Sequence, residues 1–167
     1  MTSVAGGRHS GASQTIQVKT QSPPLEEAHL SGTYHVTYTV TSSSLSNTHP
    51  GQISHYTWSL KASCRQGACG GKWIEKFRDG AHAVGHYHPT AGGSYLAEMK
   101  NQSLGFCGSV NDMKDSSSLR IRLTKAGMKD GKWTALVFTG TLREYFPGEN
   151  GCASSYFQAQ IDGKRGK

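Results

Sequence analysis

Residues 33–40, TYHVTYTV, decide the fold of this chain. Tyr34, Val36, Tyr38 and Val40 alternate with polar residues, so the apolar positions recur every second residue. In an extended strand, successive side chains point to opposite faces, and a period of two places the four apolar residues on one face. The segment is therefore predicted to be a β-strand with one buried face and one solvated face.

The same alternation recurs along the chain and predicts about eight strands joined by hairpins. Gly92-Gly93 and Asp130-Gly131 are typical of tight hairpin turns. No segment shows a helical period with caps. We therefore predict an all-β fold: an antiparallel meander that closes into a small β-barrel, because closure removes exposed strand edges. A two-sheet sandwich is the alternative. The further candidate strands lie at residues 56–60, 73–77, 82–88, 94–102, 119–123, 136–142 and 157–161.

The composition fits one domain with a modest core. The chain has 167 residues, 35% of them hydrophobic, with 21 glycines. Residues 1–28 are predicted to be a flexible linker, residues 29–162 a barrel-like domain and residues 163–167 a basic tail. No apolar run approaches the roughly 20 residues that span a bilayer. We expect any export signal or anchor to lie outside this sequence.

The segment CRQGAC, residues 64–69, is predicted to be a hairpin loop closed by a disulfide between Cys64 and Cys69. A zinc site would need a second close pair of cysteines, and redox motifs favour two intervening residues at a helix start. By elimination, Cys107 would pair with Cys152, although four cysteines allow three connectivities. Paired cysteines indicate an oxidising compartment, so the domain is expected to be extracellular or on the cell surface.

The segments GTYHVTYTVTSS (32–43) and YTWSLKASCRQGACGGKW (56–73) resemble exported β-domains of actinobacteria. Such domains occur in secreted or lipid-anchored proteins and in the extracellular parts of receptor-type serine/threonine kinases. The resemblance covers residues 30 to about 76 and implies a β-rich extracellular domain. It brings no catalytic residues. The additional histidines and the lysine-rich second half depart from it.

Three histidines are candidates for a metal site. His82, His86 and His88 would share one strand face, and His86 and His88 are close enough to bind one zinc ion if a further ligand is present. The alternative is a solvated strand face that ends at Pro89.

Four aromatic residues are candidates for a ligand site. Tyr34, Tyr38, Trp58 and Trp73 fall on the apolar faces of neighbouring strands. Small barrels that hold a ligand line the lumen with such residues. Alternatively, the four rings simply fill the core.

The net charge is +7, with a pI of about 9.3, and basic residues cluster in one hairpin. This hairpin could face an anionic polymer or lipid surface, or could be a solvated face. Nucleic acid is disfavoured because few aromatic residues are interleaved with the basic ones. The basic residues are Arg120, Arg122, Lys125, Lys129 and Lys132.

No motif of a hydrolase or phosphate-binding loop is present in the sequence. We therefore expect a non-catalytic extracytoplasmic binding or sensing module without a cofactor. Its partner would be a small apolar or envelope-derived ligand, or a protein. The alternative is a metal-binding protein or metal-dependent enzyme that uses His82, His86 and His88.

Overall fold

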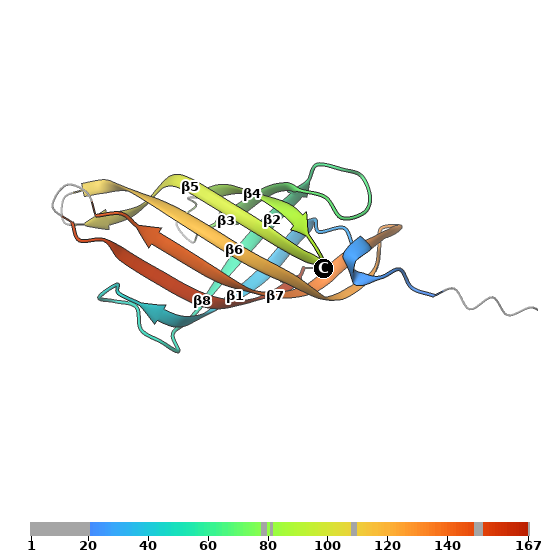
Figure 1. Cartoon of the computed structure of the whole chain (residues 1–167), viewed down its shortest axis with the longest axis horizontal. Helices are drawn as coiled ribbons and strands as arrows, with labels where there is room; N and C mark the ends of the chain where they lie inside the picture. Colours follow the sequence, from blue (N-terminus) through green and yellow to red (C-terminus); the bar gives the residue numbers. More distant parts are fainter. Residues whose placement is uncertain (1–20, 78–79, 81, 108–109, 149–151, 167) are drawn as a thin grey trace, which may run out of the picture.

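The computed structural model is an eight-stranded antiparallel barrel (Figure 1). It describes residues 21–77, 80, 82–107, 110–148 and 152–166, without the side chains of residues 101–114. One 3-10 turn, η1 (Leu25–Glu27), precedes the strands. These are β1 (Gly32–Ser43), β2 (Ile53–Ala62), β3 (Gly71–Lys76), β4 (His82–Thr90), β5 (Ser94–Cys107), β6 (Val110–Lys129), β7 (Lys132–Phe146) and β8 (Ser155–Arg165).

Each strand pairs with the next, and β1 pairs with β8 to close the barrel. The prediction of a closed meander is thus confirmed over the sandwich alternative. Turn chemistry sets the hairpins: Asp130 and Gly131 have φ values of 50° and 73° between β6 and β7. Two residues with positive φ form the turn whose twist matches that of the strands it joins.

The N-terminal segment closes one end of the barrel, which we call the plugged end (Figure 1). The backbone N–H of His29 donates to Trp133 O at 2.8 Å, and Ala135 N–H donates to His29 O at 3.1 Å. Ala28 and Leu30, on either side of His29, are fully buried. The segment before β1 is therefore held to β7 by backbone hydrogen bonds and adds two side chains to the core.

Two tyrosines donate hydrogen bonds to backbone carbonyls of this plug, and a third donates to a carbonyl of β7. Tyr87 Oη donates to Leu30 O at 2.6 Å, and Tyr95 Oη donates to Ala28 O at 3.1 Å. Tyr34 Oη donates to Ala135 O at 2.7 Å. A buried carbonyl without a partner is costly, so these hydroxyl groups allow the chain to cross the barrel end.

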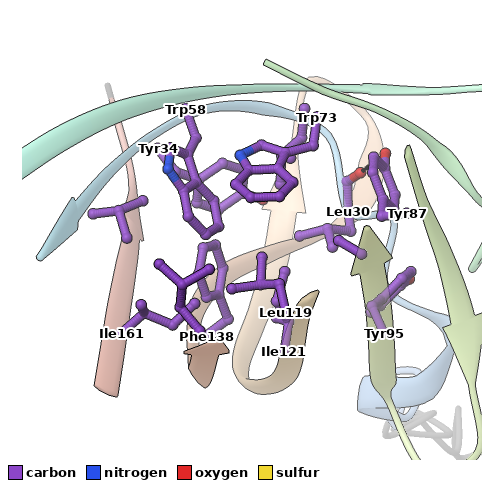
Figure 2. Packing of buried hydrophobic residues seen from close by; sticks show 14 of the residues in the cluster. Leu30, Tyr34, Trp58, Trp73, Tyr87, Tyr95, Leu119, Ile121, Phe138 and Ile161 are labelled. Atoms are coloured by element: carbon purple, nitrogen blue, oxygen red, sulfur yellow. Dashed lines mark hydrogen bonds between the residues drawn. The ribbon is translucent and has the colours of Figure 1, made fainter. Parts of the chain in front are cut away.

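The middle of the lumen is a packed aromatic layer (Figure 2). Trp58, Trp73 and Phe138 are fully buried. The ring centroids of Trp58 lie 5.0 Å from those of Trp73 and 5.7 Å from those of Phe138. Their burial supplies much of the hydrophobic stabilisation of the fold.

Two of the predicted domain boundaries differ from the structure. The barrel continues past residue 162, because β8 ends at Arg165. Gly163 faces the ring of Phe138, where a larger side chain would collide, and the Arg165 guanidinium donates to Ser31 O. At the other boundary, Ala28 belongs to the core and not to a linker. Residues 1–20 lie outside the described residues.

Candidate acidic chamber in the lumen

The half of the lumen beyond the aromatic layer contains a small cavity, which we call the acidic chamber. Its volume is about 60 Å³. Aromatic and aliphatic side chains form most of its wall, and Glu75, Ser117 and Glu144 bring polar groups to it. The lining residues are Tyr38, Tyr56, Trp73, Glu75, Phe77, Met99, Ser117, Leu142, Glu144 and Phe157.

Strand alternation explains why carboxyl groups point inward here. Glu75 follows the buried Trp73 by two residues on β3, and Glu144 follows the buried Leu142 by two residues on β7. Asp115 has the same parity as the buried Leu119 on β6, and only 2% of its surface is exposed. Each acid therefore occupies a core-facing position of its strand.

A chain of hydrogen bonds ties Glu75 to the aromatic layer. Trp58 Nε1 donates to Tyr38 Oη at 3.1 Å, and Tyr38 Oη donates to Glu75 Oε2 at 3.0 Å. The indole N–H polarises the phenol toward the carboxylate, which stabilises the charged form of Glu75. Packing in the middle layer thus fixes the orientation of the acid beyond it.

Burial opposes that effect and is the stronger influence. Desolvation raises the pKa of Glu75 from its ordinary value of 4.5 to about 7, although the hydrogen bond from Tyr38 lowers it and the charge of Asp115 raises it further. Burial also raises the pKa of Glu144, with contributions from hydrogen bonding to Asp115 and from its charge. The chamber therefore binds protons at pH values where free carboxyl groups are ionised.

Trp73 contributes a second polar group. The residue is fully buried, and its Nε1 has no hydrogen-bond acceptor among the described residues. In Figure 2 this nitrogen lies on the side of the ring away from Leu30 and Tyr87, hence away from the plugged end. An indole N–H buried without an acceptor is costly, so the wall of the chamber offers an unused donor.

The four aromatic residues predicted to hold a ligand fall into two groups. Tyr38 and Trp73 line the chamber, whereas Tyr34 and Trp58 belong to the packed core and do not line it. Sequence reasoning missed Glu75, Asp115 and Glu144 as a group. The available signal was a carboxyl group at an inward-facing position of a strand with alternating pattern. The sequence does not show that three such groups come together, because this depends on how the barrel closes.

The three histidines predicted as metal ligands share one face of a strand, as the alternation indicated. His82, His86 and His88 lie exposed on the outer face of β4. Among the described residues, one group of three or more potential ligands has its atoms within 4.8 Å of one another, and it consists of His29, Cys64 and Cys69. His82, His86 and His88 do not form such a group, and their role as metal ligands stays a prediction.

The two cysteines of that group form the predicted Cys64–Cys69 disulfide, with their Cα atoms 6.1 Å apart. The loop that they close also contacts the plug, since His29 Nδ1 lies 3.1 Å from Gly67 O. The predicted Cys107–Cys152 bridge involves a side chain outside the described residues and stays a prediction.

The predicted basic surface lies outside the barrel. Arg120 and Arg122 point outward from β6 and line a groove of about 670 Å³ together with hydroxyl groups such as those of Thr139 and Thr141. No acidic residue is among the described residues that line this groove. Lys125, Lys129 and Lys132 are exposed along the hairpin toward the plugged end.

Comparisons with protein-family models, with curated proteins and with solved structures found no match. In the part of the chain that the structure describes, no helix has the length and hydrophobicity to cross a membrane.

Proposed function

We propose that this domain is an extracytoplasmic binding or sensing module, without catalytic activity, whose ligand site is the acidic chamber. The observation that carries the proposal is that Glu75 and Glu144 line an unfilled part of an otherwise packed lumen, with the buried Asp115 interacting with both. Burying carboxyl groups costs free energy, and an apolar core would fold without that cost. A ligand that engages these groups accounts for their position.

The cavity favours a small polar ligand over the apolar one expected from the sequence. A volume of about 60 Å³ holds a few water molecules or one compact organic molecule. Large hydrophobic ligands occupy cavities of roughly 300 Å³ or more. The middle of the lumen offers no such space, because Trp58 and Phe138 fill it.

The composition of the chamber supports binding over catalysis. Ser117 is the one serine among the described lining residues, and no histidine, cysteine or lysine is among them. An activated serine normally needs an adjacent base of this kind. The Cys64–Cys69 disulfide supports an extracytoplasmic location, because disulfides persist in oxidising compartments.

The test is a screen of small polar molecules against the intact chain, with tryptophan fluorescence and melting temperature as readouts. A ligand of the chamber raises the melting temperature by mass action and perturbs Trp73. Glu75→Gln should abolish or shift the response, whereas Glu98→Gln, which changes an exposed carboxylate, should not. A ligand that gives the same shift in melting temperature and fluorescence with both variants would contradict the chamber as its binding site.

The groove at Arg120 and Arg122 favours a second partner, an anionic surface. Guanidinium groups bind phosphate in a bidentate manner, and no acidic side chain competes for them among the described lining residues. We expect salt-sensitive binding to vesicles that contain anionic lipid. The double variant Arg120→Gln/Arg122→Gln should weaken vesicle binding more than the double variant Lys129→Gln/Lys132→Gln. A larger loss in the lysine variant would mean that the tip of the hairpin, and not the groove, binds the vesicles.

A further inference from the structure

The acidic chamber has an imbalance of charge. The described residues that line it include two glutamates but no lysine, arginine or histidine. Asp115 acts electrostatically on both glutamates, so the three carboxyl groups form one interacting set. Such a set is stabilised either by protons or by a bound cation, because like charges at short range cannot all ionise without compensation.

The spacing of the carboxyl groups is unsuited to one metal ion. Calcium and magnesium hold their oxygen ligands at about 2.0–2.6 Å, so ligand atoms of one ion lie within about 5 Å of each other. Among the described residues, Glu75, Asp115 and Glu144 do not form a group with ligand atoms within 4.8 Å. A molecule with a carbon skeleton can span positions that a single ion cannot.

Two further features of the wall select the kind of molecule. The N–H of Trp73 points away from the plugged end and has no described acceptor, so the ligand should carry a hydrogen-bond acceptor. Aromatic rings of Tyr56, Phe77 and Phe157 also line the chamber. The faces of such rings attract cations within about 6 Å.

We propose that the ligand of the acidic chamber is a small protonated amine that also bears a hydrogen-bond acceptor. The ammonium group donates to the carboxyl oxygens of Glu75 and Glu144, and the acceptor receives the N–H of Trp73. The inference rests on the proposed function, and it adds the chemical class of the ligand.

Ethanolamine and ethylene glycol provide the test, because they have nearly the same size and differ in the charge of one end. Calorimetry and tryptophan fluorescence on the intact chain should show ethanolamine binding at least tenfold more tightly at pH 7. Propylamine, which lacks the acceptor, should bind more weakly than ethanolamine. Trp73→Phe should remove that difference between the two amines while preserving the aromatic volume more closely than alanine.

Substitutions and pH changes test whether the carboxyl groups are responsible for the binding of ethanolamine. Glu75→Gln should reduce ethanolamine binding at least tenfold, whereas Glu98→Gln on the outer face should leave it unchanged. Binding should weaken as the pH falls below 7, because Glu75, whose pKa burial raises to about 7, takes up a proton. Burial also raises the pKa of Glu144 and of Tyr38, which both line the chamber, so Tyr38 stays neutral over this range. Circular dichroism checks that each variant remains folded.

Three results would overturn the inference. Equal binding of ethylene glycol and ethanolamine in the chamber would show a neutral polar ligand, and the proposed function would stand. Binding of calcium or magnesium alone, abolished by Glu75→Gln, would show a metal site instead. If neither amines nor any other small polar molecule perturbs Trp73, the inference and the proposed function both fail.

Discussion

The two halves of the lumen differ in how their buried polar groups are paired. At the plugged end, the hydroxyl groups of Tyr34, Tyr87 and Tyr95 donate hydrogen bonds to backbone carbonyls. In the acidic chamber, carboxyl groups from β3 and β7 line a cavity, and the N–H of Trp73 has no described acceptor. This difference is the reason that we assign the plugged end to the maintenance of the fold and propose the chamber as the ligand site.

The largest expected effect lies in the layer between the two halves. Phe138→Ala should lower the free energy of unfolding by about 3–5 kcal/mol, because it leaves a cavity beside Trp58 and Tyr34. Phe77→Ala, at the half-buried wall of the chamber, should cost clearly less. Chemical denaturation measures both, and similar losses would mean that the chamber is as structural as the aromatic layer.

The pH dependence of stability should come from the chamber. The pKa of Glu75 is raised in the folded state to about 7, so the stabilisation from its protonated form is complete below about pH 4.5 and is lost as the pH rises through 7. The melting temperature should therefore fall between pH 5 and pH 8.

Glu75→Gln should reduce this slope, because glutamine keeps an acceptor for Tyr38 and does not ionise. At pH 8 the variant should be more stable than the parent by about 1–3 kcal/mol. Glu98→Gln is the matched control on the outer face. A variant of Glu75 with an unchanged pH profile would contradict the assignment of the titration to this residue.

The disulfide should have an intermediate effect, confined to the plugged end. The double variant Cys64→Ser/Cys69→Ser removes a bridge between cysteines that are five positions apart in the sequence. The loss of this constraint on the unfolded chain should lower the free energy of unfolding by about 2 kcal/mol. Hydrogen exchange should show faster opening near His29, which contacts Gly67 in the same loop. Unchanged exchange there would show that the loop does not support the plug.

The smallest expected effect is the loss of one hydroxyl from the plug. Tyr87→Phe removes the donor to Leu30 O and should cost about 1 kcal/mol. Tyr145→Phe, at an exposed site, should be neutral in the same denaturation measurement. If Tyr87→Phe were also neutral, water would have to replace the hydroxyl and the plug would be less tightly closed than its burial indicates.

Much of the fold was predictable because the alternation at Tyr34, Val36 and Tyr38 is local. Turn residues at Gly92 and Asp130 marked the hairpins in the same way, and the short spacing of Cys64 and Cys69 identified their bridge. The candidate site was harder to predict from the sequence. Trp58 and Tyr34 share the inward pattern of Tyr38 and Trp73, yet they belong to the packed core and do not line the chamber.

The sequence by itself determined which side of each strand is buried and in what order the strands pair, since both follow from period and loop length. Only the tertiary structure decided that Glu75, Asp115 and Glu144 come together. They lie on three different strands, and closure of the barrel makes the inward faces of these strands line the same lumen. It also decided that Leu30 and Ala28 plug one end and leave the cavity at the other. The alternation within one strand shows which of its side chains point into the lumen. It does not show which side chains of the other strands they meet there, because those contacts form only when the barrel closes.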